Sequence, residues 1–177
     1  MTSFKDRIIR AAKLDVHLYE EVEADKEAIG QAMWVVILSS IAAGVGSIAR
    51  GGVSGLLIGT ILALVGWYIW AYLTYLIGVK ILPEPQTRAD PAELLRTIGF
   101  SSSPGLIRVL GIIPGLTGVV FLVASIWMLV AMVIAVRQAL DYKSTLRAVG
   151  VCAIGWFIQA VILALVFAMF GGTAKPV

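Results

Sequence analysis

Apolar residues form long runs in this chain, and short polar segments separate the runs. Four runs are uniformly apolar, at residues 31–49, 53–80, 115–137 and 148–170. Each has about the 20 residues that an α-helix needs to cross the hydrocarbon of a bilayer, or more. The pattern therefore predicts an all-α, polytopic integral membrane protein in which these runs are transmembrane helices.

A fifth run, residues 94–113, has the same length but is interrupted by polar residues and a proline. These are Arg96, Ser101, Ser102, Ser103, Pro104 and Arg108. As an α-helix the run would rise about 30 Å, enough to cross. Pro104 cannot donate a backbone hydrogen bond, so we expect a kinked span with its polar groups turned toward other helices. We expect Arg96 and Arg108, near opposite ends, to snorkel toward the headgroups.

The distribution of lysine and arginine separates two topologies. If residues 94–113 cross and the N-terminus is inside, 11 of the 14 basic residues lie inside, against Arg50, Arg108 and Lys175 outside. If they do not cross, the counts are 10 and 4, and the basic loop 137–147 moves outside. Because cytoplasmic loops are enriched in lysine and arginine, we favour five crossings, with a cytoplasmic N-terminus and an external C-terminus.

The polar N-terminal segment, residues 3–27, has an amphipathic pattern. Its apolar residues Phe4, Ile8, Ala11, Leu18 and Val22 recur at roughly helical steps. Its first half is basic and its second half is acidic. We expect a single amphipathic helix in residues 1–30, followed by a membrane domain in residues 31–177. The helix is either solvated with one core face, or interfacial with its basic half on anionic lipid.

Small residues recur every four positions at the start of the second span. Gly51, Gly55, Gly59 and Ala63 form one stripe along a helix. Small residues let two membrane helices approach closely. We therefore expect the stripe to pack against the small residues in the second half of the first span, residues 39–47.

Turn signals lie between the runs. Arg50 to Gly52 should form the turn between the first two spans. Asp90 before Pro91 is typical of a helix N-cap with proline at the first helical position. Pro114 and Gly115 should form a tight hairpin.

Five aromatic residues, Trp67, Tyr68, Trp70, Tyr72 and Tyr75, lie in the second half of the second span. They suit an aromatic belt at the membrane interface. The alternative is a cage for a ligand.

Composition supports a membrane protein. The chain of 177 residues is 59% hydrophobic and 14% charged, whereas a soluble domain has roughly 45–50% apolar and about 25% charged residues. No Asp or Glu lies between Ala28 and Pro83. The single cysteine, Cys152, lies in an apolar run and allows no internal disulfide.

Few residues here could perform catalysis. His17 is the single histidine and lies in the polar N-terminal segment, so a histidine-based triad within the membrane is excluded. No predicted span carries Asp or Glu, and no metal-ligand spacing is present. Nor is there a basic run with interleaved aromatics for nucleic acid. We expect no enzyme activity, no cofactor, no metal and no nucleic-acid partner. Gln159, an amide in the last span, suits a helix–helix hydrogen bond.

Residues 90–151 resemble the Yip1 domain family. The matching features are Arg96, Gly99 and Phe100, the stretch from Ser101 to Pro104, the Ile113–Pro114 hairpin, a span with the central Trp127, and a basic turn from Arg137 to Lys143. The resemblance implies a five-span bundle with a cytoplasmic N-terminus. Eukaryotic members are linked to Rab-type GTPases and early secretory traffic. The N-terminal segment and the entry "EEVEADKEAIGQAMWVV" favour a prokaryotic member in a cytoplasmic (inner) membrane, to which the Rab role does not carry over.

Two functional hypotheses follow. The first is a non-enzymatic module for membrane organisation or partner binding, forming homo- or hetero-oligomers through its small-residue stripe. Its inner basic residues Arg137, Lys143 and Arg147 would contact anionic lipids. The alternative is a channel, transporter or lipid-moving protein. The polar side chains in the segment 94–113, together with Gln159, would line its polar path. Arg108 would favour an anionic solute or headgroup.

Overall fold

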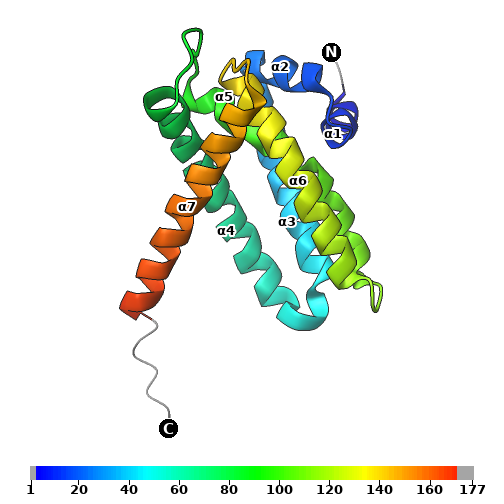
Figure 1. Cartoon of the computed structure of the whole chain (residues 1–177). Helices are drawn as coiled ribbons and strands as arrows, with labels where there is room; N and C mark the ends of the chain where they lie inside the picture. Colours follow the sequence, from blue (N-terminus) through cyan, green and yellow to red (C-terminus); the bar gives the residue numbers. More distant parts are fainter. Residues whose placement is uncertain (1–2, 171–177) are drawn as a thin grey trace.

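The computed structural model describes residues 3–170. Within this range, it describes only the backbone of residues 49–51, 53, 163 and 166–170. The elements are α1 (Phe4–Ala12), α2 (Val16–Ala24), α3 (Ala28–Gly46), α4 (Ile48–Leu76), the π-helix η1 (Ile77–Ile81), α5 (Pro91–Phe100), the 3₁₀-helix η2 (Ser103–Ile112), α6 (Thr117–Ala139) and α7 (Thr145–Phe170) (Figure 1). Every element in this part of the chain is helical, so the all-α prediction is confirmed.

Four helical segments are long and apolar enough to cross a membrane. They are Ala28–Gly46, Ser54–Ile81, Thr117–Ala139 and Thr145–Ile162. They coincide with the four uniformly apolar runs of the sequence. Each has a mean hydropathy of at least 1.7, and no more than a third of any one is buried within the chain. Helices this apolar and this exposed need lipid around them, which identifies a membrane protein.

The prediction of one amphipathic helix over residues 3–27 is wrong, because the segment folds into a hairpin of two helices. Leu14 has a φ of 62°, a left-handed conformation that ends a helix. The side chain of Asp15 then caps α2 by accepting from the backbone N–H of His17 at 3.0 Å. Helix α1 can thus lie against α2.

Ion pairs hold this α1–α2 hairpin together. The guanidinium of Arg7 lies 2.9 Å from Glu21 and 2.8 Å from Asp25. That of Arg10 lies 2.8 Å from Asp15 and 2.6 Å from Glu21. These pairs raise the pKa of Arg10 and lower that of Asp15, through hydrogen bonds first and charge second. The basic half of the segment thus pairs with its own acidic half.

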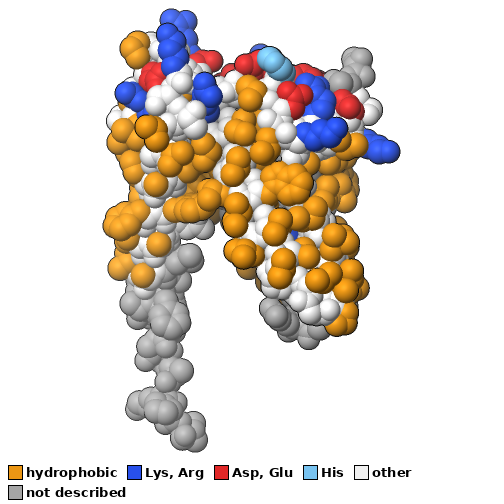
Figure 2. Space-filling view, turned by 45° about the vertical axis from the view of Figure 1, so that its right-hand side comes forward, with side chains coloured by type: hydrophobic (Ala, Val, Ile, Leu, Met, Phe, Trp, Pro, Cys, Tyr) orange, Lys and Arg blue, Asp and Glu red, His pale blue; other side chains and the backbone are white. Residues whose placement is uncertain are grey.

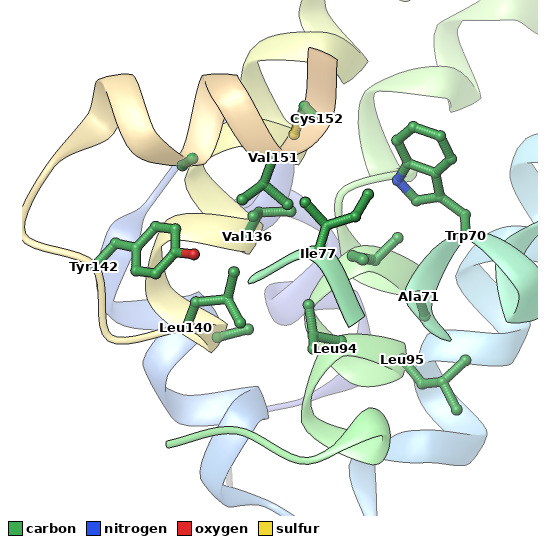
Figure 3. Packing of buried hydrophobic residues seen from close by; sticks show 13 residues of the cluster. Trp70, Ala71, Ile77, Leu94, Leu95, Val136, Leu140, Tyr142, Val151 and Cys152 are labelled. Atoms are coloured by element: carbon green, nitrogen blue, oxygen red, sulfur yellow. The ribbon is translucent and has the colours of Figure 1, made fainter. Parts of the chain in front are cut away.

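Two buried apolar clusters join the helices. In one, Leu18, Tyr19 and Val22 of α2 pack with residues of α3 and with Phe100. In the other, Ile77, Leu94 and Leu140 meet where η1, α5 and the end of α6 converge (Figure 3). The Tyr142 hydroxyl, in the same cluster, donates toward the carbonyls of Gly78 and Leu82 at 2.9 and 2.7 Å, and burial raises the pKa of Tyr142 to about 12. The clusters fasten both the hairpin and α7 to the bundle.

Residues 94–113 do not form one kinked α-helix. Helix α5 ends at Phe100, and the chain continues from Ser103 as a 3₁₀-helix with Pro104 in its first turn. Proline has no N–H for an α-helical bond, and the i→i+3 pattern avoids that requirement at its first positions. The Ser101 hydroxyl donates to the Ile98 carbonyl at 2.7 Å and satisfies a group at the end of α5.

The α5–η2 segment runs beside α3 over most of its length. A Cβ added at Gly99 would lie 2.7 Å from the Cβ of Ala32. One at Gly105 would clash with Ser39, and one at Gly46 would clash with the backbone of Arg108. Only glycine permits backbones this close.

Two predicted turns and one predicted helix N-cap are confirmed. Gly52 breaks α4 with a φ of 58° and a ψ of −169°. The Ile113–Leu116 turn has Pro114 at its second position and Gly115, with a φ of 84°, at its third, as in a type II turn. Asp90 and Glu93 form a reciprocal capping box at the start of α5.

The polar loops gather at one end of the bundle, which we call the charged end (Figure 2). It holds the α1–α2 hairpin, residues 82–90 and residues 140–144. Glu84 accepts from the backbone N–H groups of Lys143 and Ser144, which lowers its pKa. Gln86 donates to the Asp141 carbonyl at 3.0 Å, and Gln138 donates to Glu20 at 2.9 Å. The turns at Gly52 and Gly115 lie at the opposite end of the bundle (Figure 1). We call this end the hairpin end, after the turn of residues 113–116 that joins η2 to α6.

Candidate functional site

A groove lies between α3 and α4 and is closed on one side by η2 and α6. It consists of two adjoining cavities of about 320 and 270 Å³, which share Ser40, Ala63 and Arg108 in their walls. The larger is lined by aromatic, sulfur-containing, aliphatic and polar side chains, and the smaller mostly by small residues. Arg108 lies where the two meet, so we take this groove as the candidate site.

The Arg108 guanidinium points into the bundle. One terminal nitrogen donates to the Ser125 hydroxyl at 3.3 Å, and the group lies 5.6 Å from the centre of the Phe121 ring, a cation–π contact. Ser125 is eight residues along α6 from its hairpin end, about 12 Å at 1.5 Å per residue. The prediction that Arg108 snorkels outward is therefore wrong, because Phe121 and Ser125 draw the group inward.

The Arg108 charge has no carboxylate partner. Its Nε is buried and makes no hydrogen bond among the described residues. Residues 28–83 and 94–140, which supply nearly all of the groove, contain no Asp or Glu. The ion pairs found in the described part of the chain all lie at the charged end. A guanidinium keeps its proton under all ordinary conditions, so the groove carries a net positive charge.

The change from α to 3₁₀ geometry decides which serine faces the groove. A 3₁₀-helix has three residues per turn, so side chains three apart share one face. Ser102 and Arg108 both line the larger cavity, and Gly105 between them meets α3. A continuous α-helix, with 3.6 residues per turn, would instead place Ser101, Pro104 and Arg108 on one face. Ser101 bonds to its own helix, and Ser103 and Pro104 are buried, with the Ser103 hydroxyl lacking a partner among the described residues.

The small-residue stripe of α4 faces α3 but does not touch it. Gly55, Gly59 and Ala63 line the smaller cavity opposite Ala43 and Gly44. A Cβ added at Gly55 or Gly59 would meet nothing within 4 Å. The close contact is made instead by Leu56, whose Cγ would lie 2.8 Å from a Cβ at Gly44. The expected glycine packing against the first span is therefore absent, and these small residues leave the groove open. The surroundings of Gly51 lie outside the described residues.

The lining of the larger cavity includes aromatic and methionine side chains and one amide. Its aromatic residues are Trp67, Trp70 and Trp156, its methionines are Met128 and Met132, and its amide is Gln159. The Trp67 indole donates to the Leu95 carbonyl at 3.0 Å, and Trp70 is 8% exposed. Tyr68 and Tyr72 lie exposed on the outer surface of α4. The aromatic group thus divides between the groove wall and the lipid-facing surface.

Arg96 does not belong to the groove. It is 5% exposed, and its guanidinium donates to the backbone carbonyls of Val22, at 3.0 Å, and Glu23. These carbonyls lie in the last turn of α2 and have no partner within that helix. The prediction that Arg96 snorkels to headgroups is wrong, because it caps α2 and joins the hairpin to α5.

Two of the three basic residues predicted to contact lipid, Arg137 and Arg147, support loops at the charged end. Arg137 donates to the carbonyls of Tyr142 and Lys143 at 3.2 and 3.4 Å. Arg147 donates to the Pro83 carbonyl at 2.6 Å and lies 3.5 Å from Glu84. Lys143 is exposed at the charged end.

A separate cavity of about 600 Å³, outside the groove, lies at the charged end between α2 and the end of α6. It is lined by Glu20, Glu23, Glu93, Arg137, Asp141 and Lys143, among others. Burial, followed by the charges of Asp141 and Glu93, raises the pKa of Glu23 to about 7. Within the described residues no group of three His, Cys, Asp or Glu side chains could hold a metal ion.

Some groove residues were not singled out by sequence reasoning. Ser125 and Phe121 lie in a run that is apolar nearly throughout, and Ser40 stood only among the small residues of the first span. No local pattern marks them, because they become neighbours of Arg108 only when α3, η2 and α6 pack together.

Comparison with known proteins gives one match. A family model described as the Yip1 domain matches residues 17–167. This range begins in α2 and extends through most of α7, and it agrees with the resemblance seen in residues 90–151. No curated protein and no solved structure matches the chain.

Proposed function

Because the chain belongs to the Yip1 domain family, we propose that it is a non-enzymatic membrane protein of five crossings that binds another membrane component in the groove between α3 and α4. The observation that carries this proposal is the inward-pointing Arg108, which has no carboxylate partner in the groove. A charge held in a low-dielectric site is costly unless it is paired. Binding an anionic group there offsets that cost.

Contacts between loops support the fifth crossing. Residues 82–90 follow α4, residues 140–144 follow α6, and the two loops bond through Glu84 and Gln86. Both loops therefore lie on one side of the bundle. Since α6 crosses once, α5 and η2 have to cross once as well. Ten residues at 1.5 Å and ten at 2.0 Å per residue span about 35 Å, against about 30 Å of hydrocarbon.

Charge supports the orientation. The charged end carries most of the lysine and arginine side chains (Figure 2), and short basic loops stay in the cytoplasm. We place the N-terminus in the cytoplasm and the end of α7 outside, in a prokaryotic inner membrane. The C-terminal residues, including Lys175, lie outside the described part of the chain.

The groove chemistry favours binding over catalysis. Its polar side chains are an arginine, serines and an amide. None of these changes protonation near neutral pH by itself, so the groove has no general acid or base. The groove can hold a ligand by charge and by apolar contact, and of the two original hypotheses it favours the lipid- or anion-handling alternative.

A helix of another membrane protein is the second candidate occupant. The observation in its favour is that Gly55 and Gly59 line the groove with open space around them, and small residues admit a close helix. In that case the protein would act as an assembly module, as the first hypothesis held.

Site-specific photo-crosslinking tests the proposed function. A benzophenone side chain replaces Ala63, which lines both cavities, in cells that express the full chain. The matched control replaces Leu62, the neighbouring residue, which is 64% exposed on α4. We expect a defined adduct from position 63 that mass spectrometry identifies as a lipid or a protein. Adducts identical to those of position 62 would contradict a binding groove.

A further inference from the structure

We propose that the groove binds the headgroup phosphate of an anionic phospholipid at Arg108, with the acyl chains lying in the apolar part of the groove. This inference rests on the proposed binding function and names its ligand. The phosphate would accept from the free Nε and a terminal nitrogen of the guanidinium.

The hydrogen-bonding capacity left at Arg108 suits an oxyanion. A guanidinium has five N–H donors in a planar fork that matches two oxygens of a phosphate. Of the described contacts, one goes to Ser125 at 3.3 Å, and Nε makes none. Phe121 covers the group at 5.6 Å from its ring centre. The contacts with Phe121 and Ser125 therefore leave most N–H donors of the guanidinium available to an oxyanion.

The shape and lining of the groove favour a lipid over a free ion. Exposed residues, including Gly59, Gly66 and Trp156, line it along α4 and α7. It therefore opens sideways toward the bilayer. The guanidinium lies beside Phe121 and Ser125, about 6–12 Å along α6 from its first residue. A free ion would have to leave water to reach it, whereas a lipid already occupies the hydrocarbon beside the groove.

The same observations disfavour a helix as the occupant. A helix with its side chains is about 10–12 Å wide. The part of the groove beside the glycines has a volume of about 270 Å³, which is too small to hold a helix of that width. An apolar helix would also bury the guanidinium without an anion, which is the costly arrangement. A phosphate followed by narrow acyl chains fits both the charge and the width.

Native mass spectrometry of the purified full chain tests the inference. The protein in detergent is titrated with phosphatidylglycerol, with phosphatidylcholine of the same acyl chains, and with inorganic phosphate. We expect retention of phosphatidylglycerol over phosphatidylcholine. In Arg108→Gln the phosphatidylglycerol affinity should fall about ten-fold or more, the size expected for lost hydrogen bonds to a charged group. The matched control, Arg88→Gln, removes an exposed arginine outside the groove and should bind as the wild type does.

A second variant and a second signal keep the test independent of folding. Gly59→Leu keeps the charge but adds a side chain into the open space of the groove beside Arg108, and it should also lose the lipid. In a chain that retains Trp70 as its single tryptophan, brominated phosphatidylglycerol should quench the fluorescence more than brominated phosphatidylcholine does. Thermal unfolding followed by circular dichroism confirms that each variant is folded.

Three outcomes would overturn the inference. They are equal wild-type affinity for the two lipids, unchanged binding in folded Arg108→Gln, and displacement of the lipid by inorganic phosphate at equal concentration, which would make the ligand a free anion. A protein adduct at position 63 without lipid selectivity would refute this inference and leave the proposed function standing. Absence of any defined adduct there would refute the proposed function itself.

Discussion

Arg96 and Arg108 lie on one segment of the chain, and each is drawn into the bundle by a different partner. Arg96 finds the unpaired carbonyls at the end of α2, where a helix carries partial negative charge that a guanidinium stabilises. Arg108 finds a hydroxyl and an aromatic ring, neither of which carries a full charge. The first arginine is therefore structural, and the second is free to bind a ligand.

Replacing Arg96 should loosen the N-terminal hairpin. Arg96→Met keeps the buried stem and removes the bonds to α2, and we expect a loss of about 2–3 kcal/mol in unfolding free energy. The cost arises because the carbonyls of Val22 and Glu23 lose a charged donor. Thermal unfolding in detergent and limited proteolysis of residues 3–27 measure the effect.

Arg88→Met serves as the comparison, since Arg88 is exposed in the 82–90 loop. Wild-type stability and proteolysis in Arg96→Met would show that this arginine does not anchor α2.

At the scale of elements, the change from α5 to η2 determines the groove. The 3₁₀ geometry places Ser102, Gly105, Arg108 and Gly111 on one face, with Gly105 and Gly111 against α3. In a continued α-helix, with 3.6 residues per turn, Arg108 would lie about 120° around the helix axis from Ser102. The three glycines at 99, 105 and 111 then let the segment lie against α3 with little space between the backbones.

Gly105→Ala should destabilise the bundle by about 1–3 kcal/mol, because an added methyl in a full core forces its neighbours to shift. The methyl would meet the Ser39 hydroxyl and the sulfur of Met128. Gly66→Ala, inside α4, adds the same methyl into open space and should leave stability unchanged or raise it by up to about 1 kcal/mol, since alanine favours a helix over glycine. Thermal unfolding of both variants measures the difference.

A second substitution sharpens this prediction. Ser39→Ala removes the hydroxyl that the new methyl would strike, so the double variant with Gly105→Ala should recover part of the lost stability. If the effects of the two substitutions simply add, the close approach of η2 to α3 is not the cause.

At the scale of the whole molecule, charge and apolar surface are separated along the axis of the bundle. Among the described residues, the carboxylates and most basic side chains lie at the charged end (Figure 2), whereas Arg108 lies among apolar helices without a charged partner. A bilayer imposes this separation, since charged groups are costly in hydrocarbon and inexpensive at the surface. An exception at membrane depth is for that reason a candidate for function.

Labelling with a membrane-impermeant maleimide tests the topology. In a Cys152→Ala background, single cysteines replace Leu146, which is 82% exposed near the charged end, or Leu116, which is 43% exposed in the hairpin. With five crossings, intact cells should label position 116 and inverted vesicles position 146. Labelling of both positions from the same side would exclude a crossing by α5 and η2.

Much of the fold could be read from local patterns. The four apolar helices, the N-cap at Asp90 and the turns at Gly52 and Gly115 depend on hydropathy and on residues with restricted backbone preferences. The Arg108 site was anticipated in part, since Arg108, Ser102 and Gln159 line one cavity. The hairpin at Leu14 and the helix cap made by Arg96 were not anticipated, because each depends on contacts with distant residues.

The sequence by itself determined that the chain is helical, that it lies in a bilayer and that it turns at Gly52 and Gly115, because these follow from how each short segment interacts with lipid and with its own backbone. Only the tertiary structure decided that the glycine stripe leaves a groove instead of closing one, and that Arg108 points into it. Leu56 holds α4 away from the glycines of α3, and the 3₁₀ turn aims the guanidinium. Such outcomes depend on which side chains meet across helices, which no local pattern encodes.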